Sequence, residues 1–299
     1  QRFAPIVFGA VFLAAWEVFE EAKPWREADA DVVEAVDFLE YYAGEMEQLD
    51  PPPRLGRYPG ELNELFWSPR GVTVVIAPWN FPLAIPAGMV AAALVSGNPV
   101  LFKPSERASI MGYRLATILR QAGVPAGVLQ YVPGGPDVGR ELVTQASVAT
   151  IAFTGSKDVG LGMVQAAAVQ QPGQKFVKRV IAEMGGKNAI IVDDTADLDE
   201  AVTGVVQSCT GYAGQKCSAC SRVILLDSIH DAFIQRLADA VMSLRIGAAE
   251  DPATQLGPVI DGRAQKRIRD YLAIGRREGR VVVDRSMEGP GHAVGPVVI

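Results

Sequence analysis

Two patterns of hydrophobic residues alternate along the middle of the chain, between Gly71 and Asn188. Short runs of β-branched residues are each followed by a longer stretch in which apolar residues recur three or four positions apart. The short runs predict buried strands and the longer stretches predict amphipathic helices. The expected strands are 72–76, 99–102, 128–132, 150–153 and 180–182, and the expected helices are 82–95, 105–122, 136–145 and 157–168. Repeated strand–helix units of this length predict an α/β fold with a parallel sheet and helices on both faces.

A second α/β block follows, and the boundary is expected near Gly185-Gly186. Its expected strands are 189–192, 223–226 and 281–283, and its expected helices are 198–212, 229–244 and 264–276. Ahead of the first block, 12–45 has a helical pattern with charged faces, and the Pro-rich 51–69 predicts a protruding hairpin. The expected organisation is therefore 1–50, 51–69, 70–186 and 187–299.

Composition limits the classes of partner. The chain has 299 residues, of which 49% are hydrophobic and 21% charged, enough for a large core. Its net charge of −6 argues against nucleic acid or an anionic membrane surface as the main partner. Three cysteines without a disulfide framework favour a reducing compartment, so a cytoplasmic location is expected. The longest apolar run, 3–16, is too short to span a bilayer.

Cys217 carries the strongest chemical signal. It lies in the polar, Gly-led stretch 214–220, directly after a lysine and after a predicted helix. A cysteine in such a turn can form a thiolate and meet a substrate, whereas a structural cysteine is normally buried among apolar residues. The only histidines, His230 and His292, are distant in sequence, which directs the search for a base towards carboxylates.

Two polar segments directly follow predicted strands, where α/β sheets bind their ligands. In the first, Asn80 is bracketed by Pro78 and Pro82 and could donate to a developing oxyanion; it could also simply satisfy a stiff turn. In the second, Lys103 and Glu106 could bind a ribose, and the carboxylate would repel a 2′-phosphate. Ser105 could equally cap the following helix.

Two further strand ends complete the set. The Gly-Ser turn at 155–156 opens a predicted helix, where backbone amides attract phosphate, and the turn at 134–139 has a similar form. Glu183 ends an apolar strand at the inferred domain boundary, where partial desolvation would suit a general base; a solvated hinge glutamate is the alternative.

The spacing Cys217-x-x-Cys220 also fits half of a zinc site or a redox dithiol. A zinc site needs two further ligands, and only Cys209 and the two scattered histidines remain, so no metal is expected. Cys209 and Cys220 are interpreted as small buried apolar residues.

Taken together and in this order, these motifs resemble the aldehyde dehydrogenase superfamily. The motifs are 78–82, 103–106, 153–156, 183–188 and 214–217, and the resemblance covers the chain from about Ala14. Segments 21–32, 37–43 and 217–219 look like the branch that oxidises L-glutamate 5-semialdehyde, alone or as one domain of a bifunctional proline-utilisation protein. The resemblance implies a Rossmann-type NAD-binding domain followed by an α/β catalytic domain.

The resemblance also implies roles. Cys217 would be the nucleophile, Asn80 would hold the oxyanion, and Glu183 would activate the hydrolytic water. Ser218 would bind the substrate carboxylate and Glu27 would approach the same pocket. The implied NAD-binding residues are Ala77, Pro78, Trp79, Lys103, Ser105, Glu106, Gly135, Gly139, Gly155, Ser156 and Gly160. The hairpin at 51–69 would match the family's oligomerisation flap, so a homo-oligomer is expected.

The chain departs from the family in extent. It begins with Gln1 and ends in an apolar segment, 296–299, and the family's downstream Glu-x-Phe-Gly-Pro motif has no match in it. A segment of a longer protein is therefore expected. Two alternatives stay open: another NAD(P)-dependent aldehyde dehydrogenase, and a cofactor-binding fragment without catalytic activity.

Overall fold

The computed structural model describes residues 4–285 and 291–299, so the first three residues of the expected segment 1–50 lie outside the described part. The chain divides into two compact units, one formed by Ala30–Met184 and the other by Gln1–Asp29 together with Gly185–Ile299. The N-terminal residues thus group with the second half of the chain.

The unit Ala30–Met184 is built on a five-stranded parallel sheet, which confirms the predicted α/β fold. The strands are β1 (Val72–Ile76), β2 (Val100–Lys103), β3 (Leu129–Tyr131), β4 (Val148–Gly155) and β5 (Arg179–Met184). They lie in the order β3-β2-β1-β4-β5, and every neighbouring pair is parallel. The order reverses direction between β1 and β4, and α/β sheets bind their ligands outside the carboxyl ends of the strands at such a point.

Four helices connect these strands: α3 (Ala84–Val95), α4 (Ser109–Gln121), α5 (Pro136–Thr144) and α6 (Lys157–Ala168). Right-handed crossovers place α3 and α4 on one face and α5 and α6 on the other. Val74 and Ile76 of β1 join Ile151 of β4 in the core beneath α5 and α6. The expectation that Ser105 caps α4 is wrong, because the helix begins at Ser109; Ser105 Oγ instead accepts from Arg107 N (3.3 Å) in a turn before it.

The N-terminal segment forms two helices, α1 (Ala4–Glu21) and α2 (Trp25–Leu49), not the single helical stretch expected over 12–45. The break falls at Ala22, Lys23 and Pro24. Pro24 disfavours helical backbone at the residue before it, and Ala22 adopts a left-handed conformation (φ 53°) that ends α1. No helix among the described residues is long and apolar enough to cross a membrane.

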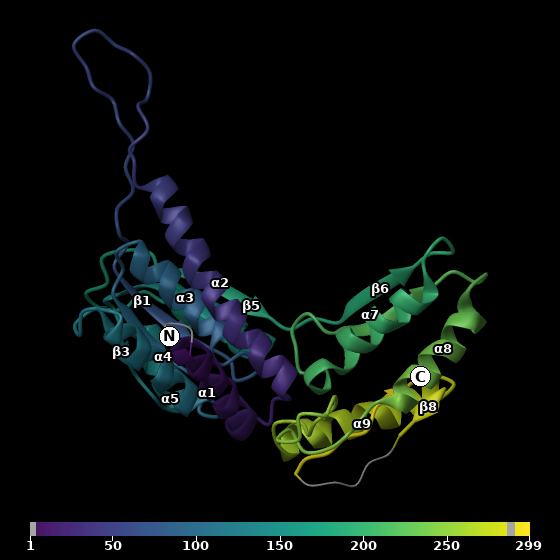
Figure 1. Cartoon of the computed structure of the whole chain (residues 1–299). Helices are drawn as coiled ribbons and strands as arrows, with labels where there is room; N and C mark the ends of the chain where they lie inside the picture. The colour runs from purple at the N-terminus through teal and green to yellow at the C-terminus, as the bar shows by residue number, and fades with distance from the viewer. Residues whose placement is uncertain (1–3, 286–290) are drawn as a thin grey trace. The chain divides into compact units, whose positions relative to one another are not determined.

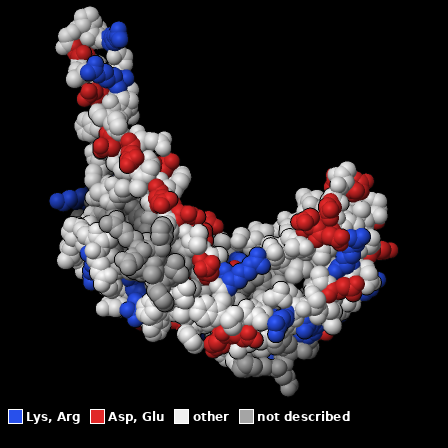
Figure 2. All heavy atoms as spheres, viewed as in Figure 1, with Lys and Arg blue, Asp and Glu red and all other residues white. Residues whose placement is uncertain are grey.

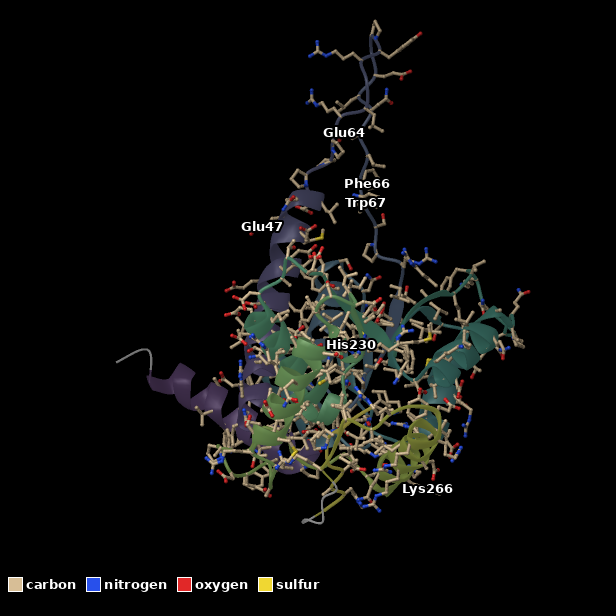
Figure 3. The ribbon with its side chains drawn as sticks, turned by 90° about the vertical axis from the view of Figure 1, so that its right-hand side faces the viewer. Glu47, Glu64, Phe66, Trp67, His230 and Lys266 are labelled. Carbon is tan, nitrogen blue, oxygen red and sulfur yellow. The ribbon has the colours of Figure 1, made fainter. Side chains whose placement is uncertain are left out.

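Segment 51–69 extends from the end of α2 away from the sheet of its unit as a two-legged loop (Figure 1). An antiparallel bridge joins Arg54 to Glu64, and Leu55 N donates to Asn63 O (2.8 Å). Acidic and basic side chains both lie near its outer end (Figure 2). Glu64 lies farther out along it than Phe66 and Trp67 (Figure 3). The predicted hairpin is therefore present, with apolar side chains exposed on it.

The other unit contains a parallel pair, β6 (Asn188–Val192) and β7 (Cys220–Leu225), and an antiparallel pair, β8 (Val283–Asp284) and β9 (Val297–Val298). Its helices from residue 185 onward are α7 (Leu198–Thr210), α8 (His230–Ser243) and α9 (Gly262–Glu278). Val192, Val205 and Phe233 lie at the centre of its core. The expectation that α7 continues to Tyr212 is wrong: it ends at Thr210, and the turn η1 (Gly211–Gly214) has left-handed residues inside it.

Candidate active site

The carboxyl ends of four neighbouring strands gather most of the predicted residues of the unit Ala30–Met184. Asn80 follows β1, Lys103 ends β2, Ser156 follows β4, and Glu183 lies next to the end of β5. Because the strands are parallel, these ends share one edge of the sheet, on both sides of the point where the strand order reverses. The sheet topology thus brings together segments that lie far apart in sequence.

The turn that carries Asn80 is fixed at both ends. Ala77 is buried, and its N–H donates to Lys103 O (3.1 Å), which continues the pairing of β1 with β2 beyond the strand. At the other end, the fully buried carboxylate of Asp31 accepts from Leu83 N (3.1 Å) and Ala84 N (3.4 Å). An acidic group at the start of α3 is also favoured by the helix dipole. Pro78, Trp79 and Asn80 are half-buried between these anchors.

Lys103 and Glu106 lie beside the glycines that begin α5. Lys103 is buried, its Nζ donates to Pro104 O (3.1 Å), and a Cβ added at Gly139 would lie 3.6 Å from its Cε. Burial lowers the pKa of Lys103, and the nearby Glu106 carboxylate partly opposes that shift. Glu106 is exposed, and a Cβ added at Gly135 would lie 3.2 Å from its Oε2. Both glycines therefore allow a cation and a carboxylate to lie close to the backbone of α5.

The helix α6 begins directly after β4, with Ser156 as its first flanking residue. The Ser156 hydroxyl does not cap the helix, so it stays available to a ligand beside the N-terminal amides. A Cβ at Gly155 would lie 2.6 Å from Phe153 Cζ, and one at Gly160 would lie 2.8 Å from Met184 Sδ. Both glycines thus permit close packing around β4 and β5, which brings the start of α6 against the sheet.

The expected partial desolvation of Glu183 is wrong. Its side chain is exposed rather than partly desolvated. The reason is its strand: β5 pairs only with β4 in the described sheet, and its exposed and half-buried residues alternate, with Glu183 on the exposed side.

Cys217 lies in the other unit, in the loop between α7 and β7. It is half-buried, and its carbonyl accepts from Asn188 Nδ2 (2.7 Å), which also donates to Ala219 O (3.2 Å). A Cβ added at Gly186 would lie 3.7 Å from Cys217 O. The motif at 186–188 therefore holds the backbone of the cysteine loop from one side.

Lys216, next to the cysteine, is paired with Glu27 at the start of α2. Their Nζ and Oε2 atoms are 2.5 Å apart, and the two side chains are 18% and 21% exposed. A Cβ at Gly211 would lie 2.7 Å from Glu27 Oε1, so a larger residue there would displace the pair. Glu27 is thus close to the cysteine loop within this unit, while Ser218 is exposed.

The other two cysteines differ from Cys217. Cys220 is buried, and its Sγ lies 3.2 Å from Arg222 O. Burial, helped by the neighbouring Cys220, raises the pKa of Cys209 to about 11, so its thiol stays protonated and weakly reactive at neutral pH. Within the described residues, no group of three or more His, Cys, Asp or Glu side chains could hold a metal ion.

Sequence reasoning missed three supporting residues: Asp31, Asn188 and Tyr212. Asp31 sits in a charged helical pattern and gives no local sign that it caps α3. Asn188 lies in the motif 183–188, but the sequence pattern assigns it no role of its own. The hydrophobic pattern places Tyr212 in a helix, and its left-handed backbone shows only in the structure. The glycines at 211 and 214 were a usable signal that the helix ends before Tyr212.

Comparison with known proteins identifies the family of the chain. The sequence model of the aldehyde dehydrogenase family matches residues 10–299. The chain is 50% identical over 270 residues to a 1-pyrroline-5-carboxylate dehydrogenase of Geobacillus thermodenitrificans, covering 90% of this chain and 52% of that protein. It is 43% identical over 288 residues to a 1-pyrroline-5-carboxylate dehydrogenase of Halalkalibacterium halodurans, covering 96% and 56%. The chain thus spans about half the length of these curated relatives.

Solved structures agree as well. A proline utilization A from Bdellovibrio bacteriovorus matches with a TM-score of 0.93 at 49% identity, over 95% of this chain and 30% of that one. A 1-pyrroline-5-carboxylate dehydrogenase from Thermus with bound NAD matches with a TM-score of 0.92 at 43% identity, over 95% and 56%. Because residues 10–299 match the family's sequence model, the chain belongs to the aldehyde dehydrogenase family.

Proposed function

We propose that the protein containing this chain is an NAD-dependent dehydrogenase that oxidises L-glutamate 5-semialdehyde, the open form of 1-pyrroline-5-carboxylate, to L-glutamate. The observation that carries the proposal is the 50% identity to a 1-pyrroline-5-carboxylate dehydrogenase over 90% of the chain. The half-buried Cys217 in a polar, tightly held loop supports it, because a nucleophilic thiol must be accessible and fixed in place.

The chain's own residues supply most of the chemistry. The Cys217 thiolate attacks the aldehyde carbon and forms a C–S bond, and the carbonyl oxygen becomes an oxyanion that accepts from Asn80 and the Cys217 backbone N–H. NAD, when bound, supplies the acceptor for the hydride leaving that carbon, so a thioester to Cys217 remains. Glu183 takes a proton from water, which attacks the thioester, breaks the C–S bond and releases glutamate. The exposed position of Glu183 supports contact with water.

The cofactor assignment rests on the carboxyl ends of β1, β2 and β4, which share one edge of the sheet. Lys103 and Glu106 would bind the adenosine ribose there, close to Gly135 and Gly139, where an added Cβ would lie 3.2 Å from Glu106 Oε2 and 3.6 Å from Lys103 Cε. Ser156, which Gly155 and Gly160 bring against the sheet, would contact the pyrophosphate, and Ser105, Ala77, Pro78 and Trp79 would complete the site. The Glu106 carboxylate favours NAD over NADP because it repels a 2′-phosphate.

Substrate recognition is assigned to two residues: Ser218, which follows Cys217 in the sequence, and Glu27, which contacts the neighbouring Lys216. Ser218 is exposed next to the nucleophile and binds the substrate carboxylate. Glu27 approaches the same pocket, and its pairing with Lys216 (2.5 Å) supports a place beside the cysteine loop.

Steady-state kinetics of the whole protein test the proposal. Glutamate semialdehyde should give a far higher kcat/KM than simple aliphatic aldehydes, and equal values would contradict the assigned substrate. Cys217→Ser should abolish turnover, whereas Cys209→Ala should retain it because that thiol stays protonated. Normal turnover by Cys217→Ser would contradict the nucleophile.

The proposal extends to assembly and location. Phe66 (71% exposed) and Trp67 (66%) lie on the 51–69 hairpin, and large aromatic side chains with so much exposed surface favour a partner. We assign that partner as a second copy of the same protein, which makes the whole protein a homo-oligomer. The free cysteines support a reducing, cytoplasmic compartment.

A further inference from the structure

Left-handed backbone outside glycine occurs at three positions in the described ranges 4–285 and 291–299: Ala22 (φ 53°), Tyr212 (φ 50°) and Ala213 (φ 54°). A Cβ makes this conformation unfavourable, so it persists only where the surroundings enforce it, often at functional sites. A hydrogen bond links Tyr212 to the residue next to Ala22. The Tyr212 hydroxyl donates to the carbonyl of Glu21 (2.9 Å), the residue before Ala22.

The Tyr212 side chain is held from several directions. It is fully buried, and Lys23 Nζ lies 5.6 Å from the centre of its ring, within cation–π range. Lys23 in turn pairs with Glu17 (3.2 Å), and both charged side chains are fully buried. The end of α1 and the turn after it therefore fix both the ring and the hydroxyl of Tyr212.

Hydrogen bonds to the backbone of Tyr212 also fix the residues between it and Cys217. Its carbonyl accepts from Gln215 N (3.1 Å) and from Gln215 Nε2 (3.2 Å), and Gln215 Oε1 accepts from Ile260 N (2.9 Å). Between them, Gly214 has φ 69°, and a Cβ there would lie 2.9 Å from Cys209 O. The chain is thus fixed from Tyr212 to Gln215, two residues before the cysteine.

We propose that Tyr212 is a positioning residue for Cys217: it anchors the left-handed turn to the end of α1 and so sets where the backbone delivers the thiol. The inference rests on the proposed function, in which Cys217 is the nucleophile. Asn188 holds the carbonyl of Cys217 independently. Loss of the Tyr212 hydroxyl should therefore loosen the upstream side of the loop without unfolding it.

Kinetics of Tyr212→Phe in the whole protein test the proposal. This change removes one hydroxyl and keeps the ring. Tyr131→Phe is the matched control, because the Tyr131 hydroxyl also donates to a backbone carbonyl, that of Ser109, at 2.9 Å. We expect kcat of Tyr212→Phe to fall about tenfold, since a small misplacement of a reacting group has a large effect on rate. The KM for NAD should not change, and Tyr131→Phe should keep the original kcat.

Alkylation by iodoacetamide, read by mass spectrometry, gives a result that needs no substrate. We expect Cys217 in Tyr212→Phe to react several-fold faster than in the unmodified protein, because its loop is freer, while Cys209 and Cys220 stay protected. Unchanged kcat and alkylation, or faster labelling of all three cysteines together, would overturn the proposal. If glutamate semialdehyde proves not to be a substrate, the alkylation result still decides the role of Tyr212.

Discussion

Ala213 is a residue with a side chain in a backbone conformation that favours glycine. It has φ 54° and ψ 31°, directly after Tyr212 in the same conformation. A side chain in the left-handed region costs about 1–2 kcal/mol per residue relative to right-handed backbone. The contacts of Tyr212 hold the turn, and the structure describes no comparable side-chain contact for Ala213. Removing the backbone strain at Ala213 should therefore change the stability measurably.

Ala213→Gly should stabilise the protein by about 0.5–1 kcal/mol, because glycine adopts this backbone without strain. The higher conformational entropy of glycine in the unfolded chain offsets only part of that effect. The same substitution at Ala273, exposed in the middle of α9, should destabilise by about 1 kcal/mol. The shifts of the urea-unfolding midpoint show whether each substitution stabilises or destabilises the protein. A destabilising Ala213→Gly would mean that the methyl group contributes more than the strain costs.

Lys178 gives a prediction for pH. It is buried, its Nζ donates to Val143 O (2.6 Å), and burial lowers its pKa below the usual 10.5. Between the lowered pKa and 10.5 the unfolded chain binds more protons than the folded one, so this residue's contribution to stability rises with pH across that window. The unfolding free energy of the unmodified protein, minus that of Lys178→Met, should therefore increase from neutral pH to about 10.5. A difference that stays flat would contradict the burial effect.

At the scale of elements, the positions of strands and helices follow the hydrophobic pattern, but their ends depend on distant groups. The predicted strands and helices of the unit Ala30–Met184 are all present, and the helix 157–168 is found with the predicted bounds. The errors are at ends: α4 begins at Ser109, α7 ends at Thr210, and Pro24 separates α1 from α2. Helix ends need partners for free N–H and C=O groups, and those partners come from elsewhere in the fold.

The start of α3 illustrates this dependence and yields a prediction. Asp31 is fully buried and accepts from Leu83 N and Ala84 N, next to the Asn80 turn. Asp31→Ala should destabilise the protein by about 2–3 kcal/mol, because it leaves two buried N–H groups without these bonds. Asp197 caps α7 through Asp199 N and Glu200 N but is exposed, so Asp197→Ala should cost only about 1 kcal/mol. Chemical denaturation compares the two; equal losses would contradict the importance of burial.

At the scale of the whole molecule, the 51–69 hairpin has too few contacts of its own to explain its apolar side chains. Outside one bridge, Arg54 to Glu64, its backbone is irregular, while Phe66 and Trp67 are exposed along it (Figure 3). A large exposed aromatic pair is more consistent with contact to another copy than with a solvated loop.

The double change Phe66→Ser, Trp67→Ser should therefore shift the whole protein to a smaller species, measured by sedimentation velocity. Val177→Ser is the control, since Val177 is 84% exposed in the same unit but lies outside the hairpin, and it should leave the assembly unchanged. An unchanged sedimentation coefficient for the double variant would rule out the hairpin as an oligomer contact.

The sequence alone determined the α/β class, the order of the strands and helices along the chain, and the segments that carry candidate chemistry, including Cys217, Asn80, Lys103 and Glu183. These follow from local periodicity and from the residue types that each reaction needs. Only the tertiary structure decided the left-handed turn at Tyr212, the cap on α3 from Asp31, the hold of Asn188 on Cys217 O, and the exposure of Glu183. The first three depend on a group far away in sequence, such as Glu21 for Tyr212, and the exposure of Glu183 depends on the place of β5 in the sheet. A linear pattern does not record which distant groups meet.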